Sequence, residues 1–115
     1  MPECIAKQYK GCQSTTTESA TVATESPSTA LSEARSLAEQ GDADAQFNLG
    51  EMYEWGKGVP QDNVCAHMWF NIAASTSNDA ADRARDMVAE DMTPTQIAKA
   101  EKLASECVAK QYKDC

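Results

Sequence analysis

Five cysteines and a single histidine are the residues of this 115-residue chain whose chemistry most needs an explanation. Two cysteine pairs share the spacing C-x7-C: Cys4 with Cys12, and Cys107 with Cys115. Zinc binding is disfavoured because C-x2-C spacing and clustered histidines are missing, and haem attachment because C-x-x-C-H is absent. Two interpretations stay open at this point: disulfide bonds, or reduced thiols that pack as small apolar side chains.

Cys65 and His67 are the remaining candidates for nucleophilic chemistry. They lie two residues apart on a predicted helix and therefore point in different directions, so they cannot form a catalytic pair. Cys65 is expected to pack in the core, with a reactive thiol or an intermolecular bond as the alternatives. No phosphate-binding loop, nucleophile elbow, zinc-hydrolase motif or calcium loop occurs. We expect no catalytic residue, no cofactor and no metal.

The charge of the chain restricts its partners. Ten Lys and Arg against 18 Asp and Glu give a formal net charge of −8, and −7 of it belongs to residues 31–115. Nucleic-acid binding is disfavoured, because affinity for the phosphate backbone comes from clustered basic residues. No apolar stretch approaches the ~20 residues that a membrane span needs. A protein or peptide is the expected partner.

Composition and an internal duplication divide the chain into three parts. Residues 3–12 read ECIAKQYKGC and residues 106–115 read ECVAKQYKDC, identical at eight of ten positions. We therefore interpret residues 1–12 as the tail of a preceding duplicated unit. Residues 13–30 hold ten Ser or Thr in eighteen positions and are predicted to be a flexible linker. Residues 31–115 are the predicted helical domain.

Apolar residues recur at spacings of three and four throughout residues 31–115, which predicts an all-α domain of about five short antiparallel helices. Gly41, Gly56 and Gly58 follow the first two apolar stripes, where glycine permits the left-handed backbone common after a helix. Asp62 is a plausible N-cap of the third helix. Thr93-Pro94-Thr95-Gln96 predicts a capping box with Pro in the first helical position.

A similarity with a period of 36 residues aligns Ala30 with Ala66 and Ala34 with Phe70, which is typical of a helical solenoid. A longer pattern consists of Gly41, Ala45, Leu49, Gly50, Tyr53, Gly56, Gly58, Asp62, Ala66, Trp69, Ala73 and Ala74. This pattern resembles a known family, the Sel-1-like repeat, a relative of the tetratricopeptide repeats. The match covers one complete repeat and the second helix of the repeat before it.

The resemblance implies a short α/α solenoid with C-terminal capping helices. A regular next repeat would place Leu near 85 and Gly near 86, where Arg85 and Asp86 stand, so residues 79–110 are interpreted as a terminal capping pair. The repeat pattern serves the fold, and no chemistry is expected from it.

The function that the resemblance implies is a non-enzymatic adaptor that binds proteins or peptides. Trp55, Tyr53 and Trp69 are the candidate partner-binding residues. Trp55 is singled out because the repeat does not require it: it either anchors a partner or covers the loop between two helices. Two alternatives are a cysteine-rich protein that binds penicillin or weakly hydrolyses β-lactams, and a truncated repeat fragment with no separate role.

The cysteine-rich bacterial branch of the family carries disulfides between consecutive helices at similar positions. By this resemblance, Cys4–Cys12 and Cys107–Cys115 are predicted to be disulfides that join helix ends. Such bonds favour an oxidising, extracytoplasmic setting, periplasmic or secreted. The start Met1-Pro2-Glu3-Cys4 lacks the features of a signal peptide, which leaves a cytoplasmic location as the alternative.

Overall fold

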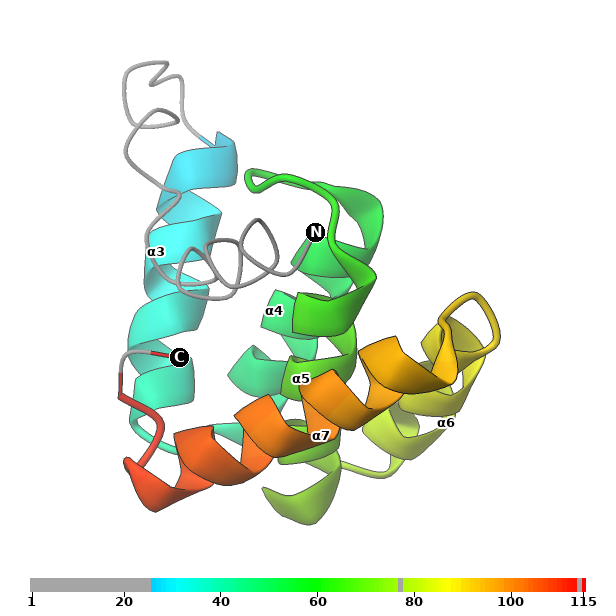
Figure 1. The fold of residues 1–115 in the computed structure, drawn as a ribbon. Coiled ribbons are helices and arrows are strands. Elements are labelled where there is room, and N and C mark those ends of the chain that lie inside the picture. The colour runs from blue at the N-terminus through cyan, green and yellow to red at the C-terminus, as the bar shows by residue number, and fades with distance from the viewer. Residues whose placement is uncertain (1–25, 77, 114) are drawn as a thin grey trace.

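The computed structural model describes residues 26–115 except 77 and 114. The described part contains five helices and no strand: α3 (Ser26–Glu39), α4 (Ala43–Trp55), α5 (Asn63–Thr76), α6 (Asp79–Ala89) and α7 (Pro94–Ala109). In Figure 1, α3 and α4 lie side by side, α5 occupies the middle, and α7 crosses in front of α5 and runs back towards α3. The predicted all-α, repeat-type fold is confirmed.

The boundaries of the helices follow local side-chain chemistry. Asp42 caps α4 by accepting the backbone N–H of Ala45 at 3.0 Å, and Asp62 accepts the N–H groups of Val64 and Cys65 at the start of α5. Such caps satisfy N–H groups that have no partner within the helix. Thr93 and Gln96 form the predicted capping box of α7, with Pro94 in the first turn.

One predicted boundary is wrong. Helix α3 begins at Ser26, so residues 26–30, assigned to the linker, belong to the first helix instead. The Ser and Thr content of this stretch suggested a flexible segment, but Pro27 is compatible with a first helical turn, where its missing N–H is not needed. Residues 1–12, the rest of the linker and the predicted Cys4–Cys12 bond lie outside the described residues.

Helix α5 is the centre of the domain, because it packs against α4, α6 and α7. Its residues 64–70, 72 and 73 are all buried. The contacts of α6 and α7 are mainly with α5 rather than with each other. Arg85 of α6 donates to Asn71 of α5 and pairs with Asp82 at 2.9 Å, which is a polar contact where a further repeat would have an apolar one. These two helices therefore pack on the same central helix, and their role as a terminal capping pair stays a prediction.

A close contact between Gly50 and Phe70 fixes the distance between α4 and α5. A Cβ atom on Gly50 would lie 2.5 Å from both Cδ1 and Cε1 of the Phe70 ring. The ring also packs against Phe47 with 5.5 Å between centroids. The absent side chain at position 50 therefore allows the two helix backbones to approach each other.

Replacing this glycine tests the contact. Gly50→Ala should lower the free energy of unfolding by about 1–3 kcal/mol, because overpacking outweighs the ~1 kcal/mol that alanine normally adds in a helix. Urea unfolding followed by circular dichroism measures the change. In a Phe70→Leu background the effect of Gly50→Ala should shrink, since the ring that it meets is gone. Equal effects in the two backgrounds would contradict the contact.

The C-terminal cysteine pair closes a loop onto the rest of the domain. Cys107 at the end of α7 is bonded to Cys115, with 5.5 Å between their Cα atoms. Between them, Gln111 and Tyr112 have positive φ angles of 59° and 68°, a region that side chains rarely adopt. The Tyr112 ring lies near Gly41, in the turn between α3 and α4. The bond thus ties the end of the chain to the start of the domain.

Cys65 differs from the expectation of a free packing thiol. It is buried, as predicted, but it is disulfide-bonded. A thiol that is already bonded is not available as a nucleophile, which removes Cys65 as a reactive site in this state.

The double variant Cys107→Ser with Cys115→Ser isolates the contribution of the C-terminal bond. We expect the free energy of unfolding to fall by about 2–3 kcal/mol, because the open chain gains conformational entropy when the short loop is no longer closed. Urea titration measures the loss. Mass spectrometry of unreduced peptides provides the direct check, and two free thiols at positions 107 and 115 would refute the pairing.

Candidate partner-binding face

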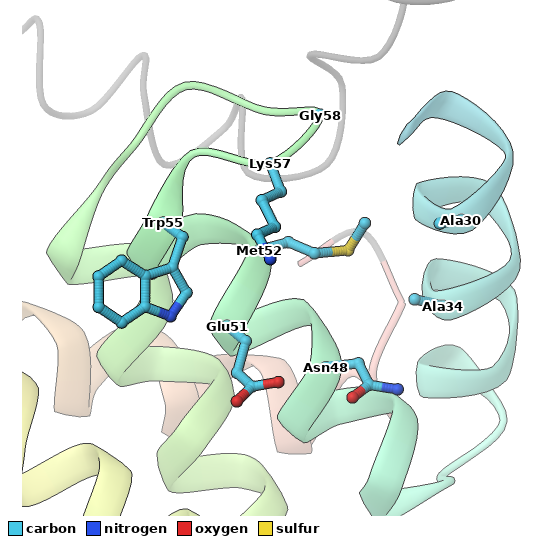
Figure 2. Close-up of a pocket in the computed structure, with 8 residues that line it drawn as sticks. All are labelled: Ala30, Ala34, Asn48, Glu51, Met52, Trp55, Lys57 and Gly58. Atoms are coloured by element: carbon cyan, nitrogen blue, oxygen red, sulfur yellow. The ribbon is translucent and has the colours of Figure 1, made fainter. Parts of the chain in front are cut away.

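An open pocket lies between α3 and α4, beneath the turn that follows α4 (Figure 2). Its volume is about 600 Å³. Helix α3 supplies two small side chains, α4 supplies most of the wall, and the turn closes one end. The lining residues are Ala30, Ala34, Asn48, Glu51, Met52, Trp55, Lys57 and Gly58.

Trp55 is the most exposed aromatic side chain of the described residues. It is the last residue of α4, and 65 % of its surface is accessible. Gly56 follows it in the left-handed conformation with φ of 71°, and the N–H of Lys57 donates to the carbonyl of Met52 at 2.8 Å. This helix ending turns the chain sharply and leaves the indole at the edge of the pocket.

The structure corrects the other two candidate partner-binding residues. Tyr53 and Trp69 are only 2 % and 1 % exposed, so neither can touch a partner while the domain is folded. Both belong to the apolar core, where aromatic side chains fill the space between paired helices. Both residues occupy positions where the Sel-1-like pattern has an aromatic side chain, which favours packing rather than binding.

The pocket is lined by one acidic and one basic side chain, Glu51 and Lys57, and Glu54 lies near Glu51 on the same helix. Burial raises the pKa of Glu54, and the neighbouring carboxylate of Glu51 raises it further. The effect of Glu51 on this pKa means that the two carboxylates on α4 repel each other. Lys57 is the one cation among the lining residues.

The residues that line this pocket were mostly missed in the sequence. Asn48, Glu51 and Met52 carry no motif, and their grouping depends on how α4 packs against α3. One usable signal was the 36-residue alignment, in which Ala34 stands where the next repeat has Phe70. A small residue at a position of large volume indicates an unfilled space beside α3.

The other features that the sequence singled out do not form a reactive centre in the described residues. No group of three or more His, Cys, Asp and Glu in the described part of the chain is placed to hold a metal ion. None of the described helices has the length and apolarity to cross a bilayer. What the face offers chemically is an apolar hollow, an exposed indole, and one acidic and one basic side chain, which suits non-covalent recognition.

The family model described as the Sel1 repeat matches residues 43–76. These residues form a Sel1 repeat. No curated protein and no solved structure shows a significant match to the chain. Sel1 repeats typically mediate protein interactions, which agrees with a face built for recognition.

The Sel1 repeat consists of α4, the turn and α5, and its defining residues occupy the places that the fold requires. Gly41, Gly56 and Gly58 all have positive φ. Leu49, Ala66 and Ala73 are fully buried. The repeat thus supplies one wall of the pocket, and α3, which precedes it, supplies the other.

His67 lies on the opposite side of the Sel1 repeat, buried between α5, α6 and α7. Burial lowers its pKa, and so does the positive charge of Arg85, while Glu101 and Asp86 act in the opposite direction. Its Nδ1 atom has no hydrogen-bond partner among the described residues. The neutral imidazole is therefore the form that fits the folded domain.

This burial predicts a pH dependence of stability. Unfolded His67 binds a proton near pH 6.5, whereas the folded form binds it only at lower pH. The free energy of unfolding should therefore fall as the pH drops below 6.5, until the folded form is protonated as well. In His67→Gln this loss should be absent, as urea titrations at pH 7.5 and 5.5 would show. The same loss in both proteins would show that His67 is not its source.

Proposed function

We propose that the chain is a non-enzymatic adaptor that binds a protein or peptide partner through the face formed by α3, α4 and Trp55. The observation that carries this proposal is the exposure of Trp55 beside an open pocket in a Sel1 repeat. Indole side chains at the centre of interfaces often contribute much of the binding free energy. The exposed indole stands beside an apolar hollow, and an indole together with such a hollow forms a larger apolar surface of the kind that marks interaction sites.

The arrangement of rigid elements supports the same function. Trp55 is fixed to a helix end rather than to a long loop, and the close contact of Gly50 with Phe70 holds that helix against α5. A preorganised face loses little conformational entropy when a partner binds. The other two sequence-based alternatives, β-lactam binding and a fragment without a role, are not favoured by any feature of the described residues.

We further propose that the chain works in an oxidising, extracytoplasmic compartment, periplasmic or secreted. The Cys107–Cys115 bond is consistent with this location, because disulfides persist where thiols are not kept reduced. In a reducing cytoplasm the C-terminal loop would be free to leave Gly41.

Partner capture by two matched variants tests the proposal. Trp55→Ala should lose partners that the wild-type chain retains from a native extract, because the indole anchors the interface. Met87→Ala is the control, since Met87 is also exposed, by 62 %, but lies on α6, at the far end of the domain from the pocket. Quantitative mass spectrometry of the retained proteins gives the comparison. Identical sets for wild type, Trp55→Ala and Met87→Ala would refute a role of this face.

A further inference from the structure

Helix α7 ends in a turn that places two residues with side chains in the left-handed region. The N–H of Tyr112 donates to the carbonyl of Cys107 at 2.8 Å, and the N–H of Gln111 donates to the carbonyl of Val108 at 2.9 Å. This pair of bonds requires a left-handed residue just after the helix, which is usually glycine. Helix α3 ends with the same pair of bonds and has Gly41 in that place, with φ of 94°. At the end of α7 the conformation is imposed on Gln111 and Tyr112 instead, which is unfavourable for both.

Two features hold this C-terminal loop (residues 107–115) in place. The Cys107–Cys115 bond closes it, and Cys115 is buried with the apolar core. Tyr112 also packs against that core, and its Cε2 atom lies 3.6 Å from the position that a Cβ atom on Gly41 would occupy. In Figure 1 the red end of the chain returns from α7 to α3, which Gly41 follows. The closed loop thus rests on the turn between α3 and α4.

Helix α3 depends on few neighbours for its position. Among the described helices it packs mainly against α4, whereas α5 packs against three. It supplies one wall of the pocket through Ala30 and Ala34. Because the C-terminal loop rests on the turn that follows α3, it is a second support of this wall, in addition to α4.

We propose that the Cys107–Cys115 bond is a redox-controlled latch of the partner-binding face. In the oxidised chain the bond holds the loop on Gly41 and keeps α3 fixed beside α4. Reduction lets Gln111 and Tyr112 leave the left-handed region, the Tyr112 ring leaves Gly41, and α3 becomes more mobile. Strained residues that persist only while their surroundings hold them are typical of such switches. The effect on partner binding rests on the proposed function, whereas the release of α3 does not.

The reaction that opens the latch is thiol–disulfide exchange with a dithiol. A thiolate of the dithiol attacks Sγ of Cys115, forms a mixed disulfide and releases Cys107 as a thiolate. Cys115 is 9 % exposed and Cys107 is 1 % exposed, so Cys115 offers the more accessible sulfur. The second thiol of the reductant then attacks the mixed disulfide, and the dithiol leaves as a disulfide. Its two electrons and two protons convert the cystine into two thiols.

NMR spectroscopy of the full chain tests the release of α3 without a partner. The resonances of Gly41 report the ring current of Tyr112, and backbone amide relaxation reports the mobility of α3. Addition of dithiothreitol, a dithiol, should shift the Gly41 resonances and lower the order parameters of residues 31–39 below the ~0.85 of a rigid backbone, while α5 stays rigid. Unchanged Gly41 resonances and unchanged mobility of α3 would refute the latch.

The double variant Cys107→Ser with Cys115→Ser identifies the responsible bond, because Cys65 is disulfide-bonded as well. Without reductant this variant should already show the changes of the reduced wild type, and dithiothreitol should add nothing at α3. Changes that appear in the variant only after dithiothreitol is added would belong to the Cys65 bond and refute the proposal. Should the double variant not fold, Tyr112→Ala takes its place: it keeps the bond, removes the ring from Gly41 and should mobilise α3. A rigid α3 in Tyr112→Ala would refute the support by the loop.

A glycine variant tests whether the loop relaxes on reduction. The reduced fraction is measured at fixed ratios of reduced to oxidised dithiothreitol, by alkylation of the thiols and mass spectrometry. Gln111→Gly should need ~5-fold more dithiol for half reduction, because glycine accepts the left-handed conformation that the closed loop demands. Lys110→Gly is the matched control and should shift in the opposite direction, since Lys110 has φ of −93° and glycine there only adds freedom to the open loop. No shift in Gln111→Gly would show that the reduced loop keeps its turn, which would overturn the latch.

Partner capture connects the latch to the proposed function. Cys107→Ser with Cys115→Ser should retain the partners that depend on Trp55 ~10-fold more weakly, because a mobile face loses more conformational entropy on binding. Unchanged capture together with a mobile α3 would refute the control of binding and leave the proposed function standing. If Trp55→Ala loses no partner, the proposed function fails, while the NMR results still decide the release of α3.

Discussion

The contact between a glycine on α4 and a phenylalanine on α5 is the constraint on which the rest of the structure depends. It sets the separation of the two helices of the Sel1 repeat, because no side chain fits between the α4 backbone and the ring. With that separation fixed, α5 is covered by α4 on one side and by α6 and α7 on others, so almost its whole surface is buried. One helix thus serves as the shared core of this small domain.

The same constraint explains why the pocket lies beside α3. The first helix of a repeat packs closely on the second, and the ring of Phe70 fills the space between them. Helix α3 has the place of a second helix but carries Ala34 at the equivalent position, and α4 packs against it. In the 36-residue alignment, α3 has the small Ala34 where α5 has the large Phe70. The pocket lies beside this small residue.

The sequence predicted the local features of the fold well, and for physical reasons. Caps and turns depend on residues close in the chain, so Asp62, the Thr93 capping box and the glycines with positive φ could be assigned without a structure. The repeat pattern gave the pairing of α4 with α5. The start of α3 differs from the prediction, because Ser and Thr content indicates flexibility by composition alone, whereas Pro27 is compatible with a first helical turn.

The candidate site could be predicted only in part, because exposure is a property of packing between distant segments. All three candidate residues are aromatic. The core contains Tyr53 and Trp69, whereas Trp55 lies at the end of α4 and is exposed to solvent. The repeat pattern already distinguished them, since it requires aromatic bulk at 53 and 69 and nothing at 55. An aromatic residue at a position that the repeat does not require is therefore the better indicator of function. An aromatic residue at a position that the repeat requires indicates a role in stability.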